Sequence, residues 1–370
     1  MESSFDDVGS FYNGLSGKSK DDFGQGSDRF ITYMNVYKNT IANPDGCELV
    51  LVENGEHQNR VEYGDILFTQ SSETLEEVGL SSVWLHKASP FLNSFCFGFH
   101  FKEKGIINPR FIAYGLRTSY MREQIIREGQ GATRYNLSSN RLKPIKLVYP
   151  SYQEQSKVAS LMSCIEKRIE KQQELICTLK KYKRGAIAHI LSGKDSEFAG
   201  EAIWAEKALS DLCCEFRSGR SISATLIHES GDYPVYGGNG IRGYCDHYSH
   251  EGEYVVVGRQ GALCGNVRLI RGQNYLSEHA IAVRANEEND TKFLLYLLDF
   301  MNLGQYSDQG AQPGLAVNKL LRLKCNVPEK KIQSKISAFL LTYDKQIAFQ
   351  ESILSLLTAQ RKAFLQQLFI

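Results

Sequence analysis

Three segments of the 370-residue chain come close to catalytic or metal-binding motifs, and each lacks a part that the chemistry requires. Residues 14–19 end like a phosphate-binding P-loop, but the first glycine of that motif would fall at position 12, which is Tyr12. Residues 238–243 have the glycine spacing of a dinucleotide-binding loop, yet the residues after them predict a turn and a strand instead of a helix. Residues 245–250 hold one cysteine and two histidines without the second ligand pair of a zinc site. A nucleotide-dependent enzyme stays an alternative, but these segments predict no catalytic centre and no metal site.

Other features of the chain also favour a non-catalytic cytoplasmic protein. Asn43-Pro44 and Asn108-Pro109 lack the second proline of the Asn-Pro-Pro-Tyr tetrad of DNA methylases. The nine cysteines are an odd number with no Cys-x-x-Cys pair, which predicts free, mostly buried thiols. Because no run of 18 apolar residues occurs and the first residues are neither basic nor apolar, we expect no membrane span and no export.

The formal charge is nearly balanced, with 43 basic and 42 acidic residues. This balance excludes a uniformly basic nucleic-acid-binding protein. The charges are distributed unevenly, since residues 1–80 hold 5 basic and 15 acidic side chains and residues 81–150 hold 11 and 3. A neutral chain can therefore present a basic face, if folding gathers its positive part on one side.

The elements that must position polar side chains come in two copies, because the chain repeats itself at an offset of 178 residues. Residues 150–158 align with residues 328–336, and the apolar positions after them stay in step. In each copy a proline precedes a heptad-like apolar pattern, which predicts a helix of about 40 residues and roughly 60 Å. We favour an antiparallel coiled-coil pair over two helices buried in separate cores.

The expected contact seam of this pair has two glutamines at equivalent positions, Gln172 and Gln350, where a polar residue would fix the register. The other predicted seam residues are Val158, Leu161, Ile165, Leu175, Leu179, Ile336, Phe339, Tyr343, Ile353 and Leu357.

The segments outside the helices are rich in Gly, Ser, Tyr and Phe and contain short runs of β-forming residues, which predicts two mixed α/β domains with irregular sheets and an α+β fold overall. The expected order is a domain at 1–149, a helical segment at 150–194, a second domain at 195–327 and a second helical segment at 328–370. We expect strands at 30–36, 65–68, 94–101, 254–257 and 280–283, and helices at 110–127 and 291–303.

Segments spread over nearly the whole chain, in this order, resemble the specificity subunit of type I restriction-modification enzymes. They are residues 17–24, 31–35, 63–68, 77–82, 93–98, 131–135 and 310–314, with the helix ends 183–185 and 361–363. The resemblance implies two target-recognition domains that alternate with two helical spacers. Each domain would read one half of an asymmetric bipartite site in double-stranded DNA, and the helices would set the gap.

The resemblance also implies partners. The helices would dock methyltransferase subunits, expected to be two, and restriction or translocase subunits would complete the complex. S-adenosylmethionine, ATP and Mg would be used by those partners, while this chain would bind no cofactor and catalyse no reaction.

In the first domain, the candidate DNA contacts lie in a polar loop after a predicted strand and in a glycine-rich loop, because such side chains read base edges and glycine permits close approach. We predict base or phosphate contacts by Thr69, Gln70, Ser71, Ser72, Gln130, Thr133, Arg134 and Tyr135, and phosphate contacts by Lys18 and Lys20.

In the second domain, the loop after the strand at 254–257 is the equivalent candidate, with the glycine-rich loop at 236–242 as its companion. The predicted contacts are Arg220, Tyr236, Asn239, Arg242, Arg259, Gln260, Gln309 and Gln312. A protein-interaction scaffold that binds no DNA is the second alternative, since the basic residues of the first helix could be a solvated face. Salt-dependent affinity for duplex DNA distinguishes the two.

Overall fold

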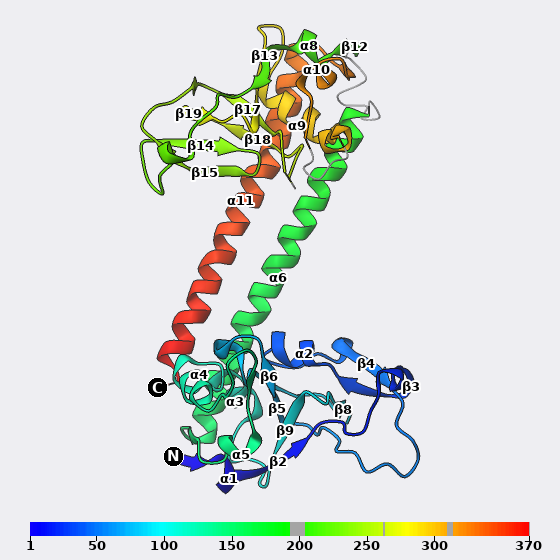
Figure 1. Ribbon diagram of the computed structural model, residues 1–370, viewed down its shortest axis with the longest axis vertical. Coiled ribbons are helices and arrows are strands. Elements are labelled where there is room, and N and C mark those ends of the chain that lie inside the picture. Colours follow the sequence, from blue (N-terminus) through cyan, green and yellow to red (C-terminus); the bar gives the residue numbers. More distant parts are fainter. Residues whose placement is uncertain (193–203, 262, 309–313, 370) are drawn as a thin grey trace. The chain divides into compact units, whose positions relative to one another are not determined.

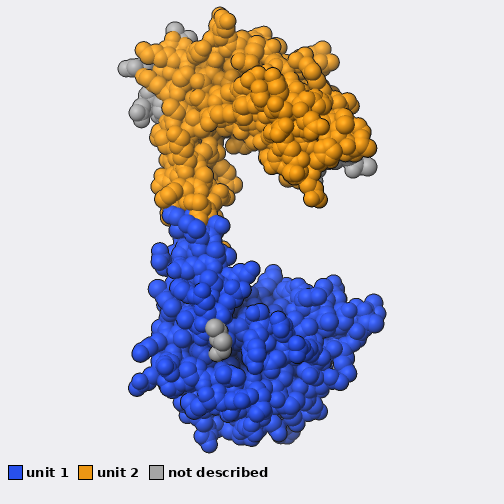
Figure 2. All heavy atoms as spheres, turned by 90° about the vertical axis from the view of Figure 1, so that its left-hand side faces the viewer, with its two compact units in different colours: residues 1–172, 353–370 blue, residues 173–352 orange. Residues whose placement is uncertain are grey.

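A computed structural model describes residues 1–192, 204–261, 263–308 and 314–369 (Figure 1). The chain divides into two compact units, Met1–Gln172 with Ile353–Ile370 and Gln173–Ser352 (Figure 2). Each unit therefore contains a globular part and a portion of both long helices. The predicted domain boundary at 194 lies outside the described residues.

The globular part of the first unit contains small, mainly antiparallel sheets and short helices. Its elements are β1 (Glu2–Ser4), α1 (Phe5–Val8), β2 (Gly9–Asn13), η1 (Lys20–Asp22), β3 (Phe23–Ile31), α2 (Tyr33–Lys38), η2 (Pro44–Gly46), β4 (Cys47–Val50), β5 (Ile66–Thr69), β6 (Ser71–Ser72), η3 (Leu75–Glu77), β7 (Ser81–Val83), β8 (Phe91–Leu92), β9 (Cys96–Phe101), α3 (Pro109–Gly115), α4 (Ser119–Arg127), β10 (Tyr135–Asn136), α5 (Ser139–Leu142) and β11 (Lys146–Val148).

The second unit has a similar set of elements. They are β12 (Ala205–Ala208), α8 (Leu209–Leu212), β13 (Cys213–Ser218), η4 (Ala224–Leu226), β14 (Tyr233–Gly237), β15 (Gly240–Cys245), β16 (His250–Glu251), β17 (Tyr254–Gly258), β18 (Val267–Ile270), β19 (Gln273–Leu276), β20 (Ala280–Ala285), α9 (Thr291–Phe300), η5 (Leu303–Tyr306), α10 (Val317–Leu320) and β21 (Lys324–Val327).

One four-stranded sheet has the same strand order in both units. The strand order β2-β9-β5-β7 in the first unit corresponds to β13-β20-β17-β18 in the second. A second sheet contains one parallel pair in each unit, β3 with β8 and β14 with β19. The internal repeat of the sequence is therefore a repeat of the fold.

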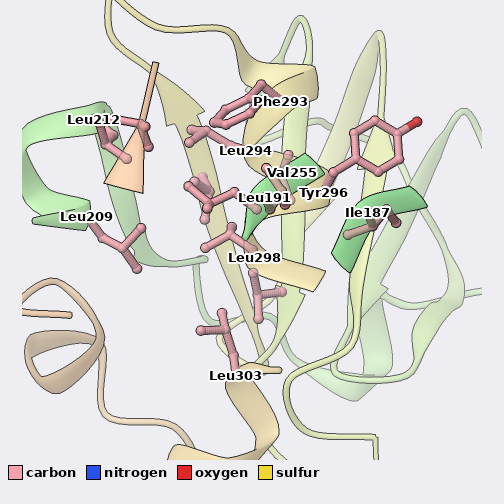
Figure 3. Packing of buried hydrophobic residues seen from close by; sticks show 14 of the residues in the cluster. Ile187, Leu191, Leu209, Leu212, Val255, Phe293, Leu294, Tyr296, Leu298 and Leu303 are labelled. Carbon is pink, nitrogen blue, oxygen red and sulfur yellow. The ribbon is translucent and has the colours of Figure 1, made fainter. Parts of the chain in front are cut away.

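Apolar side chains from the sheets, the short helices and the long helices form the core of each unit. In the first unit, Phe5, Phe68 and Phe99 lie in one buried cluster with edge-to-face ring contacts. In the second unit, Ile187 and Leu191 of the first long helix pack with α9 and β17 (Figure 3). Burying the helix ends in this way fixes each globular part to the long helices.

Two predicted elements are interrupted by the cap of a helix. The strand expected at 30–36 ends at Ile31, because Thr32 accepts a hydrogen bond from the backbone of Asn35 and caps α2. The helix expected at 110–127 is two helices, α3 and α4, because Thr118 begins a second capped helix after Gly115.

The long helices have the predicted length, with 40 residues in α6 (Tyr152–Leu191) and 38 in α11 (Lys330–Gln367). They run antiparallel where they meet in the second unit, since Lys183 bonds Asp344 at 2.5 Å and Lys180 bonds Glu351 at 2.7 Å. In the first unit, the corresponding ion pair joins Glu166 of α6 to α11. No helix among the described residues is long and apolar enough to cross a membrane.

The predicted seam needs a correction in both helices. Leu161, Leu175 and Phe339 are 40–42% exposed, so they lie beside the seam. The adjacent residues Met162 and Leu340 are buried instead. The buried or half-buried positions that follow a regular heptad are 162, 165, 169, 172, 176, 179 and 183 in α6 and 340, 343, 347, 350, 354, 357 and 361 in α11. These positions are equivalent under the 178-residue repeat, so one seam geometry occurs twice.

Candidate nucleic-acid interface

The two loops predicted in the first unit lie side by side. β6 pairs with β10, so that Ser72 lies opposite Tyr135. The backbone carbonyl of Gln70 accepts from Leu137 at 2.8 Å, and its backbone N–H donates to Phe95 at 2.9 Å. The loop after β5 is thereby fixed between two neighbouring segments, with the side chain of Gln70 exposed.

A pocket of about 450 Å³ opens beside these loops. It is lined by Tyr33, Met34, Tyr37, Ser71, Ser72, Glu73, Glu77, Phe95 and Arg134. Tyr37 donates a hydrogen bond to Glu77, which lowers the pKa of that carboxyl, so the pocket contains an ionised acid at neutral pH. Three of the predicted contacts, Ser71, Ser72 and Arg134, therefore share one concave site with aromatic residues that sequence reasoning missed.

Two predicted contacts in the first unit are wrong. Thr69 is fully buried at the end of β5, where its backbone and hydroxyl both donate to Leu80. The Lys18 side chain is 4% exposed and bonds Glu56 at 2.6 Å, so it is occupied by an internal ion pair. The remaining predicted residues, Lys20, Gln130 and Thr133, are exposed.

In the second unit the predicted contacts surround the segment 276–279, between β19 and β20. Arg220, Tyr236 and Arg259 each make one backbone hydrogen bond of 2.8–2.9 Å with this segment. The amino-acid sequence did not indicate that the segment 276–279 lies among these contacts. Its position depends on hydrogen bonds between residues far apart in the chain. Gln309 and Gln312 lie outside the described residues.

Close approach of two glycines joins the companion loop to the loop after β17. A Cβ on Gly238 would lie 2.4 Å from the carbonyl oxygen of Gln260, and a Cβ on Gly258 would lie 2.4 Å from the carbonyl oxygen of Gly238. The glycines of the 238–243 segment thus form a β14–β15 hairpin against a neighbouring loop, where a dinucleotide-binding loop would lead into a helix. Asn239 and Arg242 are exposed on this hairpin.

The two units hold different side chains on the same backbone arrangement. The backbone N–H of Arg259 donates to the carbonyl of His279, and the carbonyl of Arg259 accepts from the N–H of Leu315, both at 2.9 Å. The backbone of Gln70 makes the same two bonds with Phe95 and Leu137. Gln70 of the first unit is therefore equivalent to Arg259 of the second, and Phe95 is equivalent to His279.

A sequence profile of the family described as "Type I restriction modification DNA specificity domain" matches residues 3–180 and 202–359. The chain belongs to this family. Its two matched segments correspond to the two copies of the repeat. Among the described residues, no group of three or more His, Cys, Asp or Glu side chains could hold a metal ion.

Other members of the family are similar over part or all of the chain. The type I restriction enzyme EcoprrI specificity subunit of Escherichia coli is 44% identical over 159 residues, which are 42% of this chain and 38% of that subunit. The chain thus matches about two fifths of that relative's length. The crystal structure of a type I restriction-modification S subunit from M. genitalium covers 100% of this chain and 96% of its own, with a TM-score of 0.65 and 18% identity. A structure from a study of complex assembly in the type I R-M system covers 100% and 97%, with a TM-score of 0.63 and 14% identity.

The residues that join each globular part to the long helices also occur in both units of this chain. Gln155 is fully buried, accepts from the backbone of Asn108 at 2.7 Å and donates to two backbone carbonyls at 3.0 Å. In the second unit, Gln333 accepts from the backbone of Asp290 and donates to the carbonyl of Pro328, which are two equivalent bonds. The hydroxyl of Tyr114 donates to Glu166, and that of Tyr296 donates to Asp344. Each acid then binds a cation on the other long helix.

Proposed function

We propose that the chain is a DNA-recognition subunit of a type I restriction-modification complex, in which each globular part reads one half of a bipartite site. The observation that carries this proposal is that the two units share one backbone arrangement at these loops and carry different side chains on it. Base edges are distinguished by the donors and acceptors that face them. Two equivalent scaffolds with unlike side chains would read two different half-sites, and the complete DNA site would be asymmetric.

The long helices would act as an antiparallel coiled-coil spacer. Forty residues of α-helix span roughly 60 Å, and half-sites one helical turn apart are separated by about 34 Å. The heptad positions that are equivalent in α6 and α11, together with the antiparallel ion pairs, support this role. The spacer would set the number of base pairs between the two half-sites.

Partner subunits would supply the chemistry. Leu161, Leu175, Tyr182, Phe349 and Leu356 are exposed apolar residues of the two helices, with exposed fractions from 42% to 70%. They would dock two methyltransferase subunits, which would use S-adenosylmethionine, while restriction or translocase subunits would use ATP and Mg. The chain itself would be non-catalytic and would act in the cytoplasm.

Methylation mapping of the host genome tests the proposal. We expect an asymmetric, two-part methylated motif that disappears when the chain is deleted and returns when it is restored. Arg259→Ala and Gln70→Ala should each weaken binding to the cognate duplex about tenfold more than binding to random DNA at the same salt concentration. Absence of any motif that depends on the chain would contradict the proposal, and lack of a salt-dependent affinity for duplex DNA would favour the scaffold alternative.

A further inference from the structure

An exposed aromatic side chain lies at the loops proposed to read DNA in the first unit. Phe95 is 60% exposed, although phenylalanine is usually buried in a folded protein. Its backbone carbonyl accepts from the N–H of Gln70 at 2.9 Å, and its own N–H donates to Oδ1 of Asn93 at 2.9 Å. The turn before β9 therefore holds Phe95 beside the loop that follows β5.

Other apolar side chains surround Phe95. Phe95, Met34, Tyr33 and Tyr37 all line the pocket of about 450 Å³. The rings of Tyr33 and Tyr37 stack with their centroids 6.0 Å apart, and the Tyr33 hydroxyl donates to the carbonyl of Ser71 at 2.6 Å. Single exposed apolar residues are common on protein surfaces, whereas a group of them at one pocket indicates a binding surface.

Hydrogen-bond donors lie beside these apolar side chains. Arg134 lines the same pocket and is exposed, and a guanidinium group has donors and no acceptor. Gln70, whose backbone bonds Phe95, is also exposed, and its amide group can donate. The site therefore offers both donors and an apolar surface to the edge of an approaching base.

One base edge combines the groups that match such a surface. In the major groove, thymine presents the O4 acceptor and the C5-methyl group, and no other base has an apolar group on that edge. The phenyl ring of Phe95 has neither a hydrogen-bond donor nor an acceptor, so it reads a base edge through apolar contact. Phe95 beside exposed donors thus matches thymine better than the other three bases.

We infer that the pocket beside β6 and β10 binds the C5-methyl group of a thymine in the first half-site, with Phe95 as the residue that contacts the methyl. This inference rests on the function proposed above and names a base that the first unit reads. It applies to the first unit alone, because the equivalent residue of the second unit is His279. That side chain is polar, and its Nδ1 lies 2.5 Å from Oε1 of Gln260.

Thymine and uracil differ only in this methyl group, so replacing single thymines by deoxyuridine tests the inference. The tagged full-length chain, isolated from its host with its bound subunits, is first used to select its bipartite site from a randomised duplex library. The half-site whose base profile changes with Gln70→Ala belongs to the first unit. Each thymine on either strand of this half-site is then replaced by deoxyuridine, one at a time, and the affinity is measured at fixed salt.

We expect deoxyuridine at one position to weaken binding by the wild-type chain about fourfold, which corresponds to the burial of one methyl group. Phe95→Ala should bind the thymine duplex at least as weakly as the wild-type chain binds the uracil duplex, and it should not distinguish the two duplexes. The control is Tyr63→Ala, which removes a tyrosine that is 58% exposed and precedes the other end of β5. This variant should keep the fourfold preference for thymine.

If the wild-type chain enriches a bipartite site but binds thymine and uracil equally at every position, or if Phe95→Ala keeps the preference, the inference is wrong and the proposed function stands. A requirement for cytosine or adenine that Glu77→Gln removes, without any effect of uracil, would assign the pocket to an amino group and overturn the inference. Loss of the bound subunits from Phe95→Ala would place the ring at a protein interface, which also contradicts it. If the wild-type chain enriches no sequence, the proposed function fails and this inference fails with it.

Discussion

Gln155 shows how a single buried polar residue fixes the start of α6 to the globular part of the first unit. It satisfies one backbone N–H and two carbonyls, at 2.7 and 3.0 Å. Replacing it by leucine leaves these buried groups unpaired, so we expect Gln155→Leu to lower the free energy of unfolding by about 3 kcal/mol. Urea denaturation measures this loss. Gln153→Leu, an exposed neighbour, should change stability by less than about 0.5 kcal/mol, and equal effects would contradict the assigned role.

The ion pair between Lys18 and Glu56 gives a second prediction at the residue scale. Hydrogen bonds, of which the one from Lys18 has the largest effect, lower the pKa of Glu56 from its ordinary 4.5 to about 2. Since the folded-state pKa is depressed, the stabilisation by Glu56 is complete above pH 4.5 and disappears as the pH falls toward about 2. Lys18→Met should return the Glu56 pKa toward 4.5, as a carboxyl NMR titration would report.

The Lys18→Met substitution, compared with Lys20→Met, also tests which of the two lysines contacts DNA. Lys18→Met should leave the salt dependence of DNA binding unchanged, whereas Lys20→Met should reduce it, because Lys20 is exposed and available to phosphate. A change in the salt slope with Lys18→Met would restore Lys18 as a phosphate contact.

The positions of the candidate loops followed from sequence, but several residue roles did not. A polar run after a buried strand predicted the loop at 69–72, and β6 and β10 bring it to the loop at 129–135. Thr69 was misassigned because the strand extends one residue further than its apolar run and buries the hydroxyl. His279 had no local signal, because its hydrogen bond with Gln260 depends on the pairing of distant strands.

At the scale of the element, the heptad seam makes a clear distinction between adjacent apolar residues. Met162 is fully buried, whereas Leu161 is 42% exposed. Met162→Ala should therefore cost about 2–4 kcal/mol of unfolding free energy, and Leu161→Ala less than about 1 kcal/mol. Chemical denaturation of both variants tests the corrected seam. A larger loss for Leu161→Ala than for Met162→Ala would return the seam to its predicted position.

The sequence predicted the lengths of the long helices correctly, but it placed part of their seam one residue away. Apolar residues occur both on the seam and in an adjacent exposed row, so the pattern alone does not choose between them. Lys183 and Arg361 occupy seam positions although their side chains are charged. A search for apolar residues at heptad spacing therefore misses these two positions. Their charges are tolerated because Asp344 and Glu166 lie opposite them, reciprocally in the two units.

At the scale of the whole molecule, the positive part of the first domain has fewer cations free for phosphate than its charge suggests. Arg117 donates to four backbone carbonyls and Arg122 to three, so both stabilise the fold. Burial lowers the pKa of each guanidinium to about 10, and both remain charged at neutral pH. The net charge of residues 81–150 therefore overstates the cations available to phosphate.

The predicted cations that remain exposed or half-buried near the recognition loops are few. They are Lys20, Arg134, Arg220, Arg242 and Arg259. Each phosphate that a cation neutralises contributes about −0.9 to the slope of log K against log salt. If these five carry the binding, the isolated chain should show a slope no steeper than about −4.5 and weak affinity for arbitrary DNA at physiological salt.

Titration of a labelled random duplex with the purified full-length chain over a range of salt concentrations measures this slope. Adding the methyltransferase subunits should steepen the slope and tighten binding, because the partners would supply further phosphate contacts. A slope well beyond −4.5 for the chain alone would mean that basic residues outside the recognition loops, such as the lysines of α6, also contact the duplex. The near-zero net charge would then reflect a basic surface along the helices that is balanced by acidic globular parts. This chain, instead of its partners, would supply most of the phosphate contacts.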